Sequence, residues 1–321
     1  SPRPGLTIES YVMEYYEINS VRWADGTNES YKGIMNNYVI PGIGDTCIND
    51  FTGSDADRFL YGLLRDGLSA DYVRKIKSFL YGVMESACRD RLIVRNPVKT
   101  RLPRMRTGFR AFLDDEHLKP FYDAIRYNRY DRLYLFMLYT GARPAEAIGI
   151  TWDDIFIDGE CITVRIDHQY RNGRFCPTKT YSSRDVWAVD SSLIDILDEQ
   201  RKSQERISRR RGLMWNNPLN LVFTDDFGGA INYKSLSADF DMVRERLSSY
   251  GSSHALTLYS LRHTYATHLY AVTSDLEIVR ENLGHTSIAT TEHYVGVLSR
   301  DKMNVRRDLD GYWNNYIFQE R

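Results

Sequence analysis

The chain has 321 residues, of which 42% are hydrophobic and 26% charged, and its formal net charge at pH 7 is −1. These proportions are typical of a soluble globular protein with about two domains. No apolar run approaches the ~20 residues that a membrane span requires, and no signal-peptide pattern opens the sequence. The four cysteines (Cys47, Cys88, Cys161 and Cys176) have neither metal-binding nor redox spacing, so we expect a cytoplasmic protein without disulfides.

The first hundred residues carry the pattern of a small all-α domain, which we place at residues 1–100. The predicted helices span residues 7–19, roughly 28–39 and about 54–65, with a fourth that begins after Ser69. The second stops at Pro41-Gly42-Ile43-Gly44, and Ser54-Asp55 caps the third. The fourth has apolar residues at steps of three and four, which predict one core-facing stripe: Val73, Ile76, Leu80, Val83 and Ala87. Arg74, Lys75 and Lys77 lie off that stripe.

Residues 101–112 have no apolar period and contain Pro103, Gly108 and four arginines, among them Arg101, Arg104 and Arg106. We interpret this segment as a basic linker. Local cationic surface can bind phosphate although the total charge is near zero. Such runs are more often solvated linkers, so composition alone permits nucleic-acid binding without establishing it.

Residues 113–321 are predicted to form a second domain that is mainly helical. Helices are expected at residues 114–127, 131–139, 144–149, 191–209 and 235–247, and from 258 onward with breaks at glycines. Residues 161–166 and 184–189 alternate and are rich in β-branched side chains, and Asn172-Gly173 marks a turn between them. A small antiparallel sheet therefore interrupts the helices, and the domain belongs to a mixed α/β class.

The stretch from Leu283 to Tyr294 has a helix–helix junction pattern. Gly284 is typical of a helix C-cap, because glycine adopts left-handed backbone angles without a Cβ clash. Thr286 or Ser287 can cap a following helix that carries Tyr294. A phenol has a pKa of ~10 and attacks phosphorus only where cations stabilise the phenolate and a bound phosphate.

Four segments with such cations occur in order along the second domain. They are Thr140-Gly141-Ala142-Arg143 with Glu146, Thr178-Lys179, Leu261-Arg262-His263-Thr264, and Leu283-Gly284-His285 with Thr291 and Tyr294. This set resembles the tyrosine recombinase (phage integrase) family, whose catalytic domains carry T-G-x-R-x-x-E, T-K, L-R-H-T, L-G-H and T-x-x-Y in this order. Residues 39–44, 67–69 and 95–97 of the first domain are similar to the core-DNA-binding domain of that family.

The resemblance implies a catalytic role for five residues. Tyr294 matches the nucleophile that forms a 3′-phosphotyrosyl bond, and Arg143 and Arg262 match the pair that binds the scissile phosphate. Lys179 matches the lysine that protonates the leaving 5′ oxygen, and His285 matches a histidine that hydrogen-bonds the phosphate. The resemblance also implies candidate DNA contacts among the basic side chains of the first domain and the linker: Arg74, Lys75, Lys77, Arg101, Arg104 and Arg106.

Elementary chemistry agrees with these roles, since two guanidinium groups offer fixed donor forks to a phosphate and no metal or other cofactor is needed. Other interpretations exist for single residues: Arg143 could form a structural ion pair with Glu146, and Lys179 could be an ordinary hairpin lysine. We expect Glu146 to support an arginine or nearby backbone. Tyr259 replaces the histidine that most members have three residues before the second arginine, so it could donate a hydrogen bond but not act as an imidazole base.

The resemblance implies site-specific DNA strand exchange by a bacterial or phage-encoded integrase, working as a tetramer on two duplexes with dimers as intermediates. Alternatives are a type IB topoisomerase-like enzyme, a catalytically inactive DNA-binding protein and a metal-dependent nuclease. The acidic pairs 153–154 and 225–226 lack partner carboxylates at metal spacing, which argues against the nuclease. Residues 299–321 form a tail whose apolar stripe, Tyr312–Phe318, is predicted to dock on a neighbouring protomer, the alternative being that it packs on its own domain.

Overall fold

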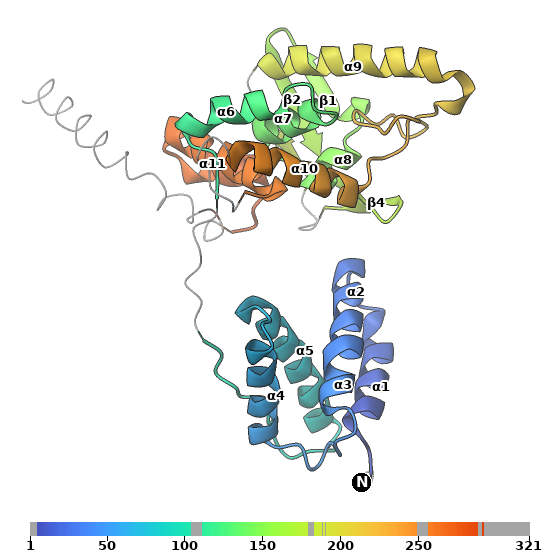
Figure 1. Ribbon diagram of the computed structural model, residues 1–321, viewed down its shortest axis with the longest axis vertical. Helices are drawn as coiled ribbons and strands as arrows, with labels where there is room; N and C mark the ends of the chain where they lie inside the picture. The colour runs from blue at the N-terminus through green and yellow to red at the C-terminus, as the bar shows by residue number, and fades with distance from the viewer. Residues whose placement is uncertain are drawn as a thin grey trace, which may run out of the picture. The chain divides into compact units, whose positions relative to one another are not determined.

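The computed structural model describes residues 5–103, 111–178, 183–187, 189, 191–248, 256–287 and 291 (Figure 1). The chain divides into two compact units, residues 1–108 and 109–321, each with its own hydrophobic core. Within the described residues, none of the helices has the length and apolarity needed to cross a bilayer.

The first unit is built from helices: α1 (Ile8–Ser20), α2 (Asp25–Ile34), α3 (Ile40–Ile43), α4 (Gly53–Arg65) and α5 (Ala70–Arg89). Helix α5 packs against α1, α2 and α4, as Figure 1 shows for α4. All five residues of the predicted stripe on α5 are fully buried in this core, which confirms the pattern. The Ser69 hydroxyl accepts from the backbone N–H of Tyr72 at 3.2 Å and caps the helix as predicted.

The second predicted helix, roughly residues 28–39, continues beyond residue 39 and ends within the predicted stop at residues 41–44. A π-helical turn, Met35–Val39, joins α2 to α3, and the N–H of Ile40 donates to the carbonyl of Met35. Pro41 therefore lies in the first turn of α3, where a missing N–H costs nothing. An irregular turn thus allows the chain to stay helical through a proline.

The predicted cap of α4 also lies elsewhere. Thr52 is the N-cap, and its hydroxyl accepts from the N–H of Asp55 at 3.3 Å while the Asp55 carboxylate accepts from the N–H of Thr52 at 3.0 Å. This reciprocal capping box satisfies two helix donors at once, which a cap at Ser54 would not do.

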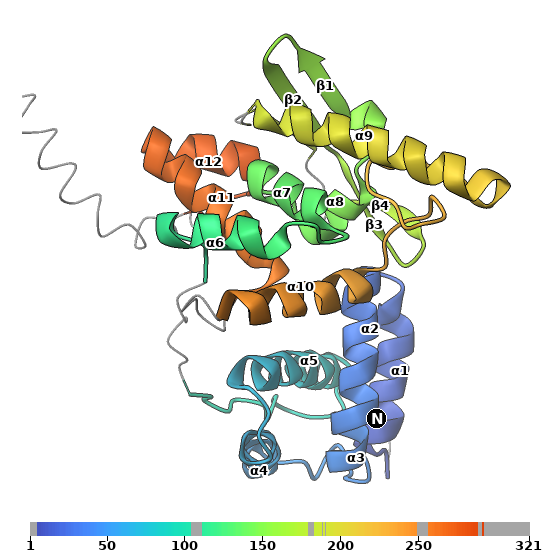
Figure 2. The same ribbon diagram turned by 45° about the horizontal axis from the view of Figure 1, so that its top comes forward.

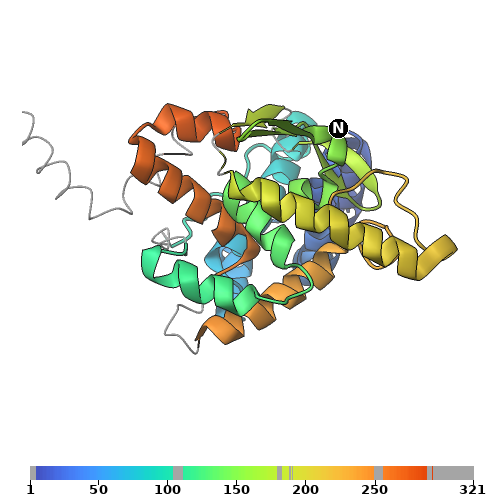
Figure 3. The ribbon, with the colours of Figure 1, turned by 90° about the horizontal axis from the view of Figure 1, so that it is seen from above.

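The second unit is mainly helical. Its helices are α6 (Asp115–Ile125), α7 (Asp131–Thr140), α8 (Pro144–Gly149), α9 (Ser192–Arg211), α10 (Tyr233–Ser248), α11 (Leu258–Thr273) and α12 (Leu276–Leu283). Five consecutive residues of α7, 133–137, are buried, because the helix packs against both α9 and α11. Figures 2 and 3 show α9 lying along α7, with α11 and α12 adjacent to each other.

The strands form two separate antiparallel sheets. Strands β1 (Ile155–Asp158), β2 (Cys161–Ile166) and β5 (Arg184–Val186) form one sheet in the order β1-β2-β5. The chain between β2 and β5 contains a second hairpin, β3 (His168–Arg171) and β4 (Arg174–Pro177), which packs on α8. The predicted turn at Asn172-Gly173 joins β3 to β4, and both residues have positive φ, as a tight hairpin requires.

The helical segment from residue 258 onward was predicted to break at glycines, but its first break lies at a serine. Helix α11 ends at Thr273, and Ser274 rather than a glycine adopts the left-handed conformation, with φ of 52°. The carboxylate of Asp275 then caps α12 by accepting from the N–H of Glu277 at 2.7 Å. Gly284 ends α12 with φ of 62°, so its prediction as a C-cap is confirmed.

Candidate active site

Arg143 lies at the corner between α7 and α8. Gly141 ends α7 with φ of 63°, and Arg143 is the N-cap of α8, with Pro144 at the first helical position. The carboxylate of Glu146 accepts both the backbone N–H of Arg143 at 2.8 Å and its Nη1 at 2.6 Å. The same side chain therefore caps the helix and orients the guanidinium group.

Arg262 reaches the same corner from α11. It is 3% exposed, and its two terminal nitrogens donate to the carbonyl oxygens of Gly141 at 2.7 Å and Leu283 at 2.6 Å. These carbonyls belong to the C-terminal ends of α7 and α12, where the helix dipole favours a cation. Arg262 therefore joins three helices at one point.

Glu146 is the buried anion between these cations, with 1% of its surface exposed. Besides Arg143, it binds Arg184 of β5 through two bonds, Nη2–Oε2 at 2.7 Å and Nη1–Oε1 at 3.3 Å. Burial alone raises the pKa of Glu146, but the charge and hydrogen bonds of Arg184, with Arg143 and Arg262, outweigh it and lower the pKa to about 2. The carboxylate is therefore ionised at neutral pH.

His285 follows the C-cap glycine of α12 and is 9% exposed. Its Nδ1 lies 3.0 Å from Oγ1 of Thr291, and its backbone N–H donates to the carbonyl of Arg280 at 3.0 Å. Burial lowers the pKa of His285 to about 3, helped by the positive charges of Arg262, Arg143 and Arg184. The imidazole is therefore neutral at pH 7, and it shares one electrostatic environment with the three arginines.

The remaining residues that the sequence singles out lie in different settings. Tyr259, in the first turn of α11, is 45% exposed, whereas Arg262 three residues later is 3% exposed. Lys179 and Tyr294 lie outside the described residues, as do Arg104 and Arg106. Thr178, which directly precedes Lys179, is 2% exposed, and Thr291, three residues before Tyr294, is 0% exposed.

The candidate DNA contacts of the first unit differ from one another. Lys75 and Arg101 are exposed, and Lys77 is half-buried. Arg74 instead forms an ion pair with Asp71 and donates to the carbonyl of Pro103. Arg74 therefore holds the start of the 101–112 segment against α5, so that DNA contact by its guanidinium would have to displace these bonds.

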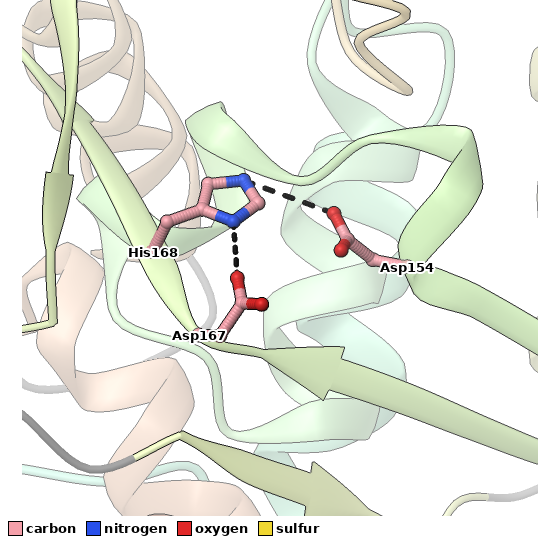
Figure 4. Close-up of side chains that lie close together, drawn as sticks. All are labelled: Asp154, Asp167 and His168. Carbon is pink, nitrogen blue, oxygen red and sulfur yellow. Dashed lines mark hydrogen bonds and ion pairs between the residues drawn. The ribbon is translucent and has the colours of Figure 1, made fainter.

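One group of possible metal ligands, Asp154, Asp167 and His168, was not expected from the sequence spacing (Figure 4). The two carboxylates face different nitrogens of the ring: Asp167 pairs with Nδ1, and Asp154 lies 3.7 Å from Nε2, which is also 2.9 Å from the carbonyl oxygen of Gly149. To bind one metal ion, a ring nitrogen and both carboxylates would have to point toward the same position. The arrangement instead lets the imidazole connect β3 to the end of α8.

Arg184 follows Thr178 and Lys179 in the sequence, where it was expected beside that motif without a role of its own, and the structure places it in this cluster. It stands in alternation with buried Val186, and both side chains face the core while Asp185 between them is exposed. An arginine in the inward phase of a strand requires a buried acceptor, and this signal is readable in the sequence.

Comparison with known proteins places this arrangement in a family. The model of a protein family described as "Phage integrase family" matches residues 111–300, more than half of the chain. A tyrosine recombinase XerC-like protein of Caldanaerobacter subterraneus subsp. tengcongensis is 26% identical over 92% of this chain and 80% of its own. The ICEBs1 integrase of Bacillus subtilis is 24% identical over 87% of this chain and 76% of its own.

Solved structures share the fold at lower identity. The Tn1549 transposon integrase in complex with transposon right end DNA is 18% identical, with a TM-score of 0.76 over 90% of this chain and 94% of that one. A lambda integrase(75-356) dimer bound to a COC′ core site is 19% identical, with a TM-score of 0.69 over 90% and 95%. The chain belongs to the phage integrase family, the family of the tyrosine recombinases.

Proposed function

We propose that this protein is a site-specific DNA recombinase that cleaves and rejoins DNA through a 3′-phosphotyrosyl intermediate. The observation that supports it most is the buried cluster of Arg143, Arg262 and neutral His285 around the ionised Glu146. Two guanidinium groups and an imidazole converge there from three separate segments: the corner between α7 and α8, the helix α11, and the turn after α12. Such a cluster suits one phosphate whose charge must be stabilised during transfer.

Tyr294 is the nucleophile of the proposed reaction. Its hydroxyl proton passes to water, and the resulting phenolate oxygen forms a bond to the scissile phosphorus while the bond from phosphorus to the 5′ oxygen breaks. Lys179 donates a proton to that 5′ oxygen, which leaves as a hydroxyl. The phosphate then joins the 3′ end of the DNA to the oxygen of Tyr294. Attack by a 5′-hydroxyl from another strand breaks the bond between phosphorus and the tyrosine oxygen and rejoins the DNA. The bond energy is conserved, so no ATP is used.

The arginines stabilise the pentacoordinate transition state in this proposal. A guanidinium offers donors in a rigid plane that match two phosphate oxygens. Arg143 and Arg262 are held by Glu146 and by the helix carbonyls before substrate arrives, which reduces the reorganisation that the reaction requires. His285, neutral and buried, donates a hydrogen bond to the same phosphate, and the exposed Tyr259 contacts the DNA beside it.

We further propose that the two units divide the work. The helical domain of residues 1–100, the linker 101–112 and the catalytic domain 113–321 together bind the duplex, with Lys75, Lys77, Arg101, Arg104 and Arg106 contacting phosphates. Both solved relatives named above are DNA complexes, and one is a dimer, which supports DNA as the partner. The protein assembles on DNA as a tetramer through dimers, helped by Tyr312–Phe318, and acts in the cytoplasm, where bacterial DNA lies.

The test is covalent trapping on a nicked duplex, in which the short 5′-hydroxyl fragment diffuses away after cleavage. The wild-type protein is expected to form a DNA adduct at Tyr294 in the presence of EDTA, and Tyr294→Phe to bind the same DNA without forming one. An adduct that persists in Tyr294→Phe would assign the nucleophile to another residue, and a strict Mg²⁺ requirement would contradict the mechanism.

Trapping together with a reaction on supercoiled plasmid DNA separates the alternatives. Relaxation of supercoiled DNA without exchanged strands would favour a type IB topoisomerase-like enzyme. Binding without any adduct would indicate an inactive DNA-binding protein. Sequencing the DNA attached to Tyr294 identifies the target site in the case that we expect.

A further inference from the structure

Arg184 holds together the parts of the catalytic cluster that come from distant segments of the chain. Its side chain is 4% exposed, and it lies at the start of β5, the third strand of the sheet. Two of its nitrogens bind the two oxygens of Glu146, and its Nε donates to the carbonyl of Asn282 at 3.0 Å. One planar group therefore bridges α8 and the last turn of α12.

The C-terminal end of α12 fits closely around this guanidinium. A Cβ on Gly284 would lie 2.7 Å from Cδ of Arg184, so only glycine leaves room for the side chain at that turn. The side chain of Asn282 adds a second link, since its Oδ1 accepts from the backbone N–H of Trp187 at 3.1 Å. The turn that precedes His285 is thus fixed at two points, to Arg184 of β5 and to Trp187 directly after that strand.

Glu146 transmits the position of Arg184 to the proposed phosphate ligand. Its Oε1 accepts from both Arg184 and Arg143, and its Oε2 accepts from Arg184 and from the N–H of Arg143. If Arg184 moved, the carboxylate would lose two of its four bonds and the guanidinium of Arg143 would lose its fixed orientation. Each of the three guanidinium nitrogens of Arg184, Nη2, Nη1 and Nε, donates to a protein group.

We infer that Arg184 is a positioning residue for strand cleavage, which orients Arg143 through Glu146 and fixes the turn that carries His285. The inference rests on the proposed function of this site. A lysine cannot replace it, because a single ammonium cannot meet both oxygens of Glu146 and the carbonyl of Asn282 in one plane. Misplacement of a catalytic group by about 1 Å costs on the order of 10²-fold in rate.

The test compares Arg184→Lys with a matched control, Arg165→Lys. Arg165 lies on the neighbouring strand β2 and pairs with Asp185, but its side chain is 50% exposed and far less constrained. In single-turnover trapping on the nicked duplex, Arg184→Lys is expected to cleave on the order of 10²-fold more slowly, with unchanged DNA affinity. Arg165→Lys is expected to match the wild type in both. Equal cleavage by the two variants, or a loss of affinity that accounts for the loss of rate, would overturn the inference.

A second variant separates positioning from simple neutralisation of a buried charge. Glu146→Gln/Arg184→Met removes both charges together, which often leaves stability nearly unchanged. Positioning predicts that this double variant folds but cleaves more slowly than Glu146→Gln alone. Equal rates would mean that Arg184 only neutralises Glu146. A wild-type protein that forms no adduct would instead refute the proposed function itself, so the two failures are distinguishable.

Discussion

Arg262 donates a hydrogen bond to the carbonyl oxygen of Gly141 at 2.7 Å, which joins α11 to the turn that carries Arg143. The two arginines are 119 positions apart in the sequence, yet one glycine turn determines the position of both. A Cβ at position 141 would lie 2.4 Å from Cδ1 of Tyr265, so the turn is crowded as well as left-handed. The cluster is therefore preorganised by backbone geometry.

Gly141→Ala should consequently destabilise the protein more than an equivalent substitution elsewhere. Gly159 is a matched control, since its φ of 60° is close to the 63° of Gly141 but no atom lies within 4 Å of its Cβ position. We expect about 1 kcal/mol from the backbone at either position, and about 1–3 kcal/mol more at 141 from the overlap. Urea unfolding measures the loss in the free energy of unfolding for Gly141→Ala and for Gly159→Ala. Equal losses would show that the crowding around position 141 relaxes without cost.

Arg143→Lys keeps the positive charge but loses the planar fork of donors. We expect a loss of about 2–4 kcal/mol in transition-state stabilisation, with little loss in DNA affinity. Single-turnover cleavage and equilibrium binding on the same duplex measure the two quantities. Cleavage at the wild-type rate would mean that Arg143 serves Glu146 as a structural ion-pair partner only.

Lys179→Ala tests the general acid. If Lys179 protonates the leaving 5′ oxygen, the variant should cleave about 10²–10⁴-fold more slowly. A substrate with sulfur at the bridging 5′ position has a leaving group that needs no proton, and it should restore most of the rate. If sulfur gives no recovery, Lys179 positions the DNA rather than donating a proton.

The buried imidazole of His285 predicts a pH dependence of stability in the DNA-free protein. Its pKa is about 3 in the folded state, against 6.5 for an ordinary histidine. Below pH 6.5 the unfolded chain therefore binds a proton that the folded chain does not, and the free energy of unfolding falls as the pH decreases. The limit for one such group is about 1.4 kcal/mol per pH unit.

The free energy of unfolding should consequently fall less between pH 7 and pH 5 in His285→Gln than in the wild type, as measured by urea unfolding. This range avoids Glu146, whose lowered pKa makes it a second source of acid sensitivity only below its ordinary value of 4.5. Between pH 7 and pH 8 the two proteins should show the same slope. Identical slopes down to pH 5 would mean that the imidazole is protonated without cost.

The amino-acid sequence by itself determined the local features of this protein. The buried stripe of α5 follows from helical spacing, since residues three and four apart share one face. Gly141 and Gly284 end helices because only glycine adopts left-handed angles freely, and this places Arg143 and His285 directly after helix ends. The order of the cationic segments also identified the family that the comparison then showed.

Only the tertiary structure decided which side chains meet. Arg184 and Glu146 are 38 positions apart, and their pairing depends on the register of β5 against β2 and on where α12 ends. Likewise, His168 meets Asp154 only because an added hairpin packs on α8. Pro41 stayed helical because a π-helical turn preceded it. Periodicity describes one element at a time, whereas burial of a charge requires partners from several elements, and their contacts form only when the chain folds.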